Sequence, residues 1–363
     1  MADFVRKTEY FLKHHWLTIA FVMGFMTDLI LLNQIDNLFD NLILLFYVCL
    51  ATISMLLLYV GVSEKGPRFL VRFFNWSSPM IMQYAFGGLL SGMLIFYGRS
   101  GDWFSSAPFL LLIVFVIFGN EMIGKRSDKL IYHITLYFIG LFSYVVMVLP
   151  VLTGKMGDGM FVLSGLIALM LVIFVVQLLY RIVPHFMALN TKRVILSIGS
   201  VYVLFNIFYF TSIIPPIPLS LTTLDVVQSV DTMMAADGGK SYRVTYELQP
   251  WYRKIPFVDD VLHPAHSSIA CFARVYAPTK LSTTIYHRWE YKDVNGDWAQ
   301  YGDRIGYAIA GSNQAGYGGY TRIANFTSGI WRCSVETERG QVLGRREMKV
   351  VVGAPKELET RIE

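Results

Sequence analysis

Long apolar stretches fill the first 218 residues of the chain, whereas the remainder is polar with short alternating runs. A helix needs about 20 mostly apolar residues to cross a membrane, because its backbone must satisfy its own hydrogen bonds in lipid. About seven stretches meet this requirement: 16–35, 42–62, 79–97, 107–123, 130–152, 160–182 and 194–214. A soluble protein would have to bury all of them in one domain. The pattern therefore predicts a polytopic membrane α-helical bundle of about seven transmembrane helices over residues 1–218.

Positively charged residues alternate between the loops that join these stretches. They precede the first stretch and follow the second, fourth and sixth: Arg6, Lys7, Lys13, Lys65, Arg68, Arg72, Lys125, Arg126, Lys129, Arg181, Lys192 and Arg193. Cytoplasmic loops carry an excess of Lys and Arg, so the N-terminus is predicted to be cytoplasmic. An odd number of crossings then places the C-terminal part outside. The first apolar stretch lacks a small-x-small cleavage site and is expected to stay as an anchor.

From about residue 241 the apolar positions alternate with a period of two, which is typical of β-strands. The predicted strands are 242–248, 268–276, 282–291, 298–301, 304–309, 320–324, 330–337 and 341–351. Asn295-Gly296 favours a hairpin with a type I′ turn, because both central residues of that turn need positive φ. Many short strands without a long helix predict an all-β, immunoglobulin-like sandwich over residues 241–363. Residues 219–240 are expected to form a linker or interfacial segment.

Two cysteines lie in the predicted strands. Cys271 and Cys333 each have apolar neighbours on the same strand face, and Trp289 lies between them in the sequence. The order Cys, Trp, Cys is that of an immunoglobulin domain with an inter-sheet disulfide. In an oxidising compartment such a bridge would contribute about 2–4 kcal/mol. We predict that the two are bridged; the alternative is two buried free thiols, since a sequence does not show whether two β-carbons meet.

Short motifs in the C-terminal half resemble a known family. They are Ala277-Pro278, His287-Arg288-Trp289, Ala310-Gly311-Ser312, Gly316-Tyr317, Gly329-Ile330-Trp331-Arg332 and Gly340-Gln341-Val342-Leu343-Gly344. As a set they resemble a bacterial polytopic inner-membrane protein family with a C-terminal domain of unknown function (DUF2914-like). The Ile-Ile-Pro-Pro-Ile-Pro-Leu stretch that ends the last apolar segment is similar to the same family. The resemblance implies a bacterial inner (cytoplasmic) membrane location with a periplasmic β domain, and it implies no activity.

No sequence signature of an enzyme is present. The chain has no Gly-x-Ser-x-Gly, His-Glu-x-x-His, phosphate-loop or Cys-x-x-Cys motif. His263 and His266 are separated by a proline and lack a nearby carboxylate cluster, which favours a plain loop over a metal site. We therefore expect no catalytic residues, no cofactor and no metal. The net charge of +5 comes largely from the predicted cytoplasmic loops, so we expect no nucleic-acid partner.

The connection between residues 310 and 319 is rich in glycine and carries polar side chains. Glycine permits backbone shapes that are closed to other residues, and tyrosine supplies contact area. We expect a ligand or partner loop formed by Asn313, Gln314 and Tyr317, with Tyr320 next to it. The alternative is an ordinary hairpin connection.

Ionisable groups inside a membrane are costly and are therefore candidates for function. The candidates in the apolar stretches are Asp28, Glu121, His133 and Arg181. Glu121, His133 and Arg181 are expected at the cytoplasmic end, where a Glu121–Arg181 pair between helices is the favoured interpretation. Asp28 is expected in the outer half, with no basic partner in any stretch.

Taken together, these features predict a non-enzymatic inner-membrane protein. Its periplasmic β domain is expected to bind a protein or an envelope glycan, while the bundle lies in the lipid bilayer as an anchor or an assembly subunit. The alternative is a transporter or intramembrane enzyme with a site around Asp28 or Glu121. The apolar stretches show no clear inverted repeat, which argues against a transporter.

Overall fold

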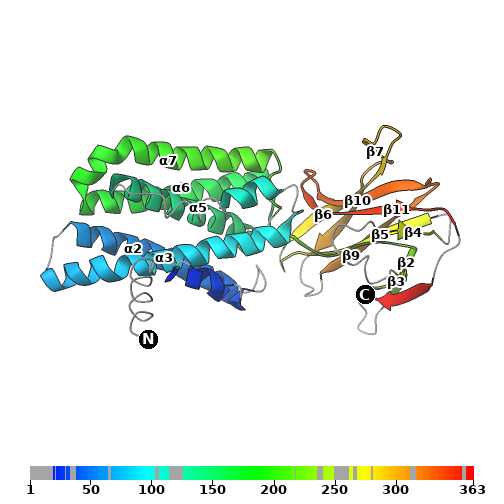
Figure 1. The fold of residues 1–363 in the computed structure, drawn as a ribbon, viewed down its shortest axis with the longest axis horizontal. Coiled ribbons are helices and arrows are strands. Elements are labelled where there is room, and N and C mark those ends of the chain that lie inside the picture. The colour runs from blue at the N-terminus through cyan, green and yellow to red at the C-terminus, as the bar shows by residue number, and fades with distance from the viewer. Residues whose placement is uncertain are drawn as a thin grey trace, which may run out of the picture. The chain divides into compact units, whose positions relative to one another are not determined.

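The computed structural model in Figure 1 describes most of the chain. The described residues are 19–20, 22–28, 30–32, 38–63, 67–102, 106–113, 126–216, 218–234, 240–248, 261–264, 268–278, 281–310, 316–353 and 357–363. The chain divides into two compact units. The first comprises Met1–Gly98 and Ala107–Ile214, and the second comprises Arg99–Ser106 and Pro215–Glu363.

The first unit is helical. Five of its helices are long and apolar enough to cross a membrane: α2 (Leu38–Val62), α3 (Arg68–Ser100), α5 (Arg126–Thr153), α6 (Asp158–Ile182) and α7 (Pro184–Phe210). They correspond to the second, third, fifth, sixth and seventh predicted spans. Residues 22–28 and 106–113 are helical too, but much of the first and fourth predicted spans lies outside the described residues.

The helices of this unit differ in how much of their surface is buried. In α3 and α5, 72% of the most apolar stretch is buried, against 33% in α6 and 22% in α7. The exposed faces of α6 and α7 still carry large apolar side chains, including Leu163, Met170, Phe174, Leu189, Leu196 and Val203. Helices with apolar side chains on their exposed faces suit a lipid environment and not water.

Glycines allow close helix contacts in this unit at Gly88 and Gly92 of α3. A β-carbon added at Gly88 would lie 2.5 Å from the ring of Tyr47, and one at Gly92 would lie 2.6 Å from the side chain of Leu44. Both tight contacts are made by side chains of α2 against α3. The small residues of α3 therefore serve packing.

The described strands of the second unit form three β-sheets. A three-stranded sheet has the order β1 (Ser220–Val227), β5 (Ser268–Tyr276), β9 (Tyr317–Ala324). A six-stranded sheet has the order β4 (Val261–Leu262), β11 (Val342–Val350), β10 (Gly329–Thr337), β6 (Ser282–Lys292), β7 (Trp298–Gln300). Its sixth strand, β8 (Ile305–Ala310), also pairs with β6. A third sheet has the order β12 (Leu358–Ile362), β3 (Lys240–Glu247), β2 (Ser229–Met234). All pairs are antiparallel except β4 with β11.

The central strand β5 is covered on both faces. Ile269 and Cys271 pack against Trp289, Trp331 and other residues of the six-stranded sheet. The alternate residues of β5, Ala270 and Phe272, pack against valines of β1, β2 and β3. A strand that is buried on both faces has an almost continuous apolar sequence. This explains why the observed bounds of β5 match the predicted strand 268–276.

Three local expectations need correction. The segment 219–240 contains strands β1 and β2 and is not a linker, so the second unit begins well before residue 241. The expected loop 310–319 is shorter, because β8 extends to Ala310 and β9 begins at Tyr317. The hairpin at Asn295-Gly296 exists, but its connection spans residues 293–297, where the Asp293 carboxylate accepts hydrogen bonds from the backbone N–H groups of Asn295 and Asp297.

Candidate functional site

A disulfide joins two of the sheets in the core of the second unit. It links Cys271 of β5 to Cys333 of β10, and the two Cα atoms are 6.4 Å apart. Both residues are fully buried. The bridge therefore connects the three-stranded sheet to the six-stranded sheet at the centre of their shared core.

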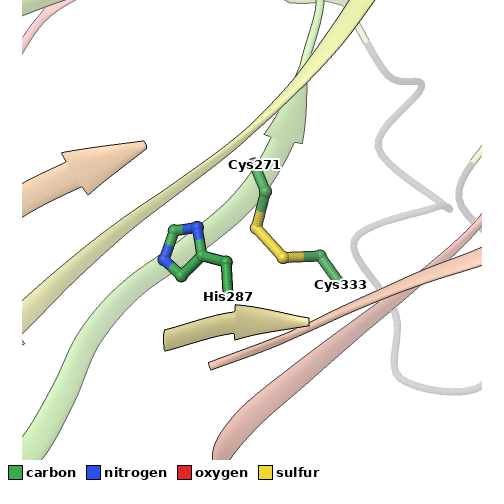
Figure 2. Close-up of side chains that lie close together, drawn as sticks. All are labelled: Cys271, His287 and Cys333. Carbon is green, nitrogen blue, oxygen red and sulfur yellow. A yellow bond between two sulfur atoms is a disulfide. The ribbon is translucent and has the colours of Figure 1, made fainter. Parts of the chain in front are cut away.

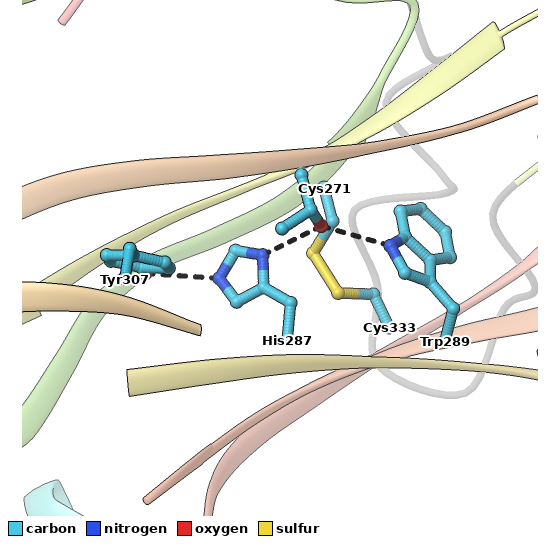
Figure 3. Close-up of a disulfide and its surroundings, with 6 residues drawn as sticks. Cys271, His287, Trp289, Tyr307 and Cys333 are labelled. Carbon is cyan, nitrogen blue, oxygen red and sulfur yellow. Dashed lines mark hydrogen bonds between the residues drawn. A yellow bond between two sulfur atoms is a disulfide. The ribbon is translucent and has the colours of Figure 1, made fainter. Parts of the chain in front are cut away.

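A chain of polar side chains runs beside this disulfide (Figure 3). The ring of His287 contacts the hydroxyl of Thr321 through Nδ1 and the hydroxyl of Tyr307 through Nε2, each at 3.1 Å. Trp289 donates its indole N–H to the Thr321 oxygen at 3.0 Å. With Nε2 protonated, Thr321 donates to Nδ1 and His287 donates to Tyr307, so both ring nitrogens of a neutral imidazole have partners.

Burial makes this neutral form the stable one. Desolvation lowers the pKa of His287 to about 3, because a charged imidazolium would lose its hydration in the core. Burial also raises the pKa of Tyr307. Neither group is therefore set up to exchange protons near neutral pH. The chain links β6 to β9 and acts as a second, polar connection between the same two sheets.

Cys271, His287 and Cys333 also form the kind of residue set that binds zinc in other proteins (Figure 2). Their potential ligand atoms all lie within 4.8 Å of one another. The two sulfur atoms are bonded to each other, however, so neither is a thiolate. Both ring nitrogens of His287 already have hydrogen-bond partners. In this state the three residues serve as a cross-link and a core contact.

The outer face of the six-stranded sheet carries a charged cluster with an aromatic ring. We call Glu290, Lys292, Trp298, Arg332 and Glu347 the Trp298 patch. The guanidinium carbon of Arg332 lies 4.0 Å from the centroid of the Trp298 ring, and Lys292 Nζ lies 5.5 Å from it. Arg332 also contacts Glu290 at 2.8 Å and Glu347 at 3.5 Å.

The strand register explains this arrangement. Arg332 faces Glu347 of β11 on one side and Glu290 of β6 on the other, and Lys292 faces Trp298 across the hairpin. Opposite charges on adjacent strands attract, and an aromatic ring beneath a guanidinium adds a cation–π contact. Trp and Arg are also the residues that contribute most at protein interfaces. Trp298 and Arg332 are therefore the two members of the Trp298 patch of the types that dominate protein interfaces, although the Arg332 side chain is only 13% exposed.

A small hollow of about 110 Å³ lies elsewhere in the second unit. It is lined by Asp225, Val226, Val227, Tyr246, Glu247, Val261, Leu262, Arg346, Met348 and Arg361. Its charges are largely compensated internally: Arg361 contacts Asp225 at 2.6 Å, and Glu247 holds both the backbone N–H and the ring Nδ1 of His263 at 2.8 Å. His263 thus has a local partner, and His266 lies outside the described residues.

The structure describes two of the four residues expected in the partner loop, and both lie on strand β9. Tyr317 is exposed, and Tyr320 packs edge-to-face on Tyr242 with the Arg322 guanidinium 5.2 Å from its ring. Asn313 and Gln314 lie outside the described residues. A β-carbon at Gly318 would lie 2.5 Å from the Tyr242 ring. This glycine therefore makes room for an aromatic ring, which the sequence alone did not reveal.

Two of the ionisable candidates in the helical unit, Asp28 and His133, have separate hydrogen-bond partners. Asp28 is buried and accepts hydrogen bonds from the hydroxyl of Tyr47, at 2.8 Å, and from that of Ser91. His133 is buried with its Nδ1 3.4 Å from the hydroxyl of Tyr59. Arg181 is exposed in the last turn of α6, and Glu121 lies outside the described residues. Asp28 therefore has the hydrogen bonds of a structural group.

Comparison with solved structures yields a similarity to Pseudomonas fluorescens alkylpurine DNA glycosylase AlkC bound to DNA containing an abasic site analog. The identity is 8%, the TM-score is 0.19, and the match covers 88% of this chain and 100% of that one. A TM-score this low carries no inference about fold or function. No curated protein matches the chain.

One family model matches part of the second unit. The matched residues are 282–350, which run from β6 to β11 and include Cys333, His287 and the Trp298 patch. This is the family that the sequence motifs resemble. The C-terminal region of this chain therefore carries the domain described as "Protein of unknown function (DUF2914)".

Proposed function

We propose that this chain is a non-enzymatic protein of the bacterial inner membrane whose second unit binds a protein partner through the Trp298 patch. In this proposal the helical bundle of about seven spans is an anchor or assembly subunit. The N-terminus is cytoplasmic, and the β-rich unit is an immunoglobulin-like sandwich in the periplasm. The Cys271–Cys333 disulfide is consistent with an oxidising compartment.

The observation that carries the proposal is the contact of Arg332 with Trp298 and two carboxylates. Charged groups of a protein partner can pair with Arg332 or with the two carboxylates, while apolar groups of the partner pack around the Trp298 ring. An envelope glycan would instead stack on an uncovered aromatic face, whereas Trp298 already has a guanidinium 4.0 Å from its ring centroid. A protein partner is therefore favoured over a glycan.

The alternative of a transporter or intramembrane enzyme has less support. Asp28 accepts hydrogen bonds from Tyr47 and Ser91, so its oxygens stabilise the packing of neighbouring helices. A buried carboxyl with satisfied hydrogen bonds needs no transported ion to explain it.

Site-specific photo-crosslinking in living cells tests the proposal. Gln300 is exposed on β7, the strand of Trp298, and a benzophenone amino acid at this position should capture a protein that mass spectrometry can identify. The same probe at Thr232, an exposed residue of β2 in another sheet, is the matched control. Trp298→Ala should abolish the adduct at position 300. An adduct that persists in this variant, or that forms equally at position 232, would refute the proposed surface.

The membrane orientation has its own test. A reporter that fluoresces only in the cytoplasm is fused to Glu363. Dark cells with normal amounts of fusion protein are expected from alternating Lys and Arg in the loops. Bright cells would contradict a periplasmic second unit.

A further inference from the structure

Strand β12 lies at the edge of its sheet, as far as the described strands show. It pairs only with β3 among the described strands. Tyr242 and Glu363 exchange backbone hydrogen bonds, and Leu248 donates to the carbonyl of Glu357. Hydrogen-bonded pairs alternate along an antiparallel ladder, so the odd-numbered residues of β12 bond to β3. The N–H and C=O groups of Leu358, Thr360 and Ile362 therefore point away from it.

Strand β12 lies beside the C-terminus (Figure 1, red strand), and four of its five residues are exposed. Leu358 and Ile362 are apolar, yet they expose 39% and 71% of their surface. An uncovered strand edge with apolar side chains favours pairing with another strand.

The sequence of β12 is symmetric about its central residue. It reads Leu-Glu-Thr-Arg-Ile from 358 to 362. If a second copy pairs antiparallel with Thr360 opposite Thr360, then Leu358 faces Ile362 of the other copy and Glu359 faces Arg361 of the other copy. Each cross-strand pair is then apolar with apolar or acidic with basic, and both types stabilise a sheet.

The backbone independently requires even residues to pair with even residues, which the symmetric register satisfies. The free groups belong to even-numbered residues, so even residues must form the hydrogen-bonded pairs with the second copy. Pairing 360 with 360, and 358 with 362, meets this condition. A slip by one residue would place free groups opposite groups that already bond to β3.

We propose that β12 pairs antiparallel with β12 of a second copy, which joins two β2–β3–β12 sheets into one continuous sheet. The site lies on a different sheet from the Trp298 patch, so it goes beyond the partner surface proposed above and does not depend on that patch. Within its own chain, Glu359 accepts a hydrogen bond from the hydroxyl of Tyr246, and Arg361 contacts Asp225. Both side chains lie on the same side of the sheet, where each would also face the second copy.

The contact is small. Five residues of strand extend about 17 Å, and a stable interface in solution usually buries at least about 1,000 Å². We therefore expect weak association of the proteins in dilute detergent. Two copies confined to one membrane have a much higher effective concentration, so the experiment uses full-length protein in native membranes.

Disulfide trapping tests the proposed register. Cys49 is first replaced by Ser, since it is the free cysteine among the described residues. In the proposed dimer the two Thr360 Cα atoms lie about 5.5 Å apart, as in any hydrogen-bonded antiparallel pair, and disulfides span about 4.4–6.8 Å. Thr360→Cys should therefore give a covalent dimer on a non-reducing gel after mild oxidation.

Neighbouring cysteines supply matched controls. The two copies of residue 358 would lie about 14 Å apart along the strands, too far for a bridge, so Leu358→Cys alone should stay monomeric. The double variant Leu358→Cys with Ile362→Cys should form a dimer again. Its two cysteines cannot bridge within one strand, because they are also about 13–14 Å apart.

A proline variant tests the hydrogen bonds. The N–H of Thr360 points away from β3, so Thr360→Pro preserves the pairing with β3 but removes a donor at the proposed two-fold axis. In the background of the 358 and 362 cysteines, this change should abolish the dimer.

Three outcomes would overturn the proposal. Equal dimer formation by Thr360→Cys and Leu358→Cys would indicate random collision. Absence of a dimer from Thr360→Cys, while the variant resists protease as the parent does, would show that the edge does not self-pair. A cross-link from position 360 to a different protein would show that the edge receives an extended segment of another partner.

Discussion

Acid pH should destabilise the second unit through His287. The folded state keeps this imidazole neutral, since burial lowers its pKa to about 3 from the ordinary value of 6.5. The unfolded chain takes up a proton below pH 6.5, whereas the folded chain does not. Stability from this residue is therefore complete above pH 6.5 and is lost as the pH falls toward 3.

The size of the effect follows from the difference between the two pKa values. At 1.36 kcal/mol per pKa unit, unfolding should become easier by about 2 kcal/mol at pH 5 and by at most about 5 kcal/mol near pH 3. Burial raises the pKa of Glu336, which stabilises the fold as the pH falls and opposes the histidine. The wild-type curve alone therefore does not isolate His287.

His287→Gln supplies the comparison. A glutamine amide both accepts and donates, so it can keep partners in Thr321 and Tyr307 without titrating. Urea unfolding of the full-length protein in mild detergent, read by pulse proteolysis of the second unit, is measured at pH 7.5 and pH 5. The wild type should lose about 2 kcal/mol more than the variant over this interval. Parallel pH dependence of the two proteins would refute the reasoning.

Three further changes should have measurable effects. Removing the disulfide by Cys271→Ala with Cys333→Ala should lower the free energy of unfolding by about 4 kcal/mol for a separation of 62 residues, as measured by urea midpoints. Asp28→Leu should lower the melting temperature in detergent more than Asp28→Asn, because leucine removes the carboxylate that accepts from the Tyr47 hydroxyl, at about 1–3 kcal/mol, whereas Ser91 can still donate to the Gly88 carbonyl; equal melting would contradict this. Gly319→Ala should destabilise by about 1–3 kcal/mol, since its β-carbon would overlap a tyrosine ring, whereas Gly353→Ala meets nothing and is the control.

Burial patterns determined how much of the fold the sequence revealed. Strand β5 was predicted with its observed bounds because alternate residues are buried on each face. Strands β1 and β2 have mostly half-buried or exposed residues, and β12 is exposed over most of its length. Without a buried face such strands lack the period-two signal. They form because neighbouring strands provide hydrogen-bond partners, which only the assembled sheet shows.

The candidate sites were less predictable than the fold. Arg332 ends one of the motifs of the sequence and Trp298 begins a predicted strand, but the contact between them depends on the pairing of three separate strands, β7, β6 and β10. The glycines at 318 and 319 suggested a flexible loop, whereas they accommodate tyrosine rings from β3 and β8. A single sequence does not state which residues face each other across a sheet, so such contacts require the register.

The uneven burial of the helices has a consequence for evolution. On the exposed apolar faces of α6 and α7, a side chain such as Leu196, 71% exposed, need only stay apolar if these helices cross a membrane. Drift among leucine, isoleucine, valine and phenylalanine is then nearly neutral. In α3 and α5 a residue such as Ala85, fully buried, is constrained in volume, and an enlarged side chain requires a compensating change in a neighbouring helix. The two sides of one bundle should therefore diverge among descendants at different rates, with paired substitutions concentrated in the inner helices.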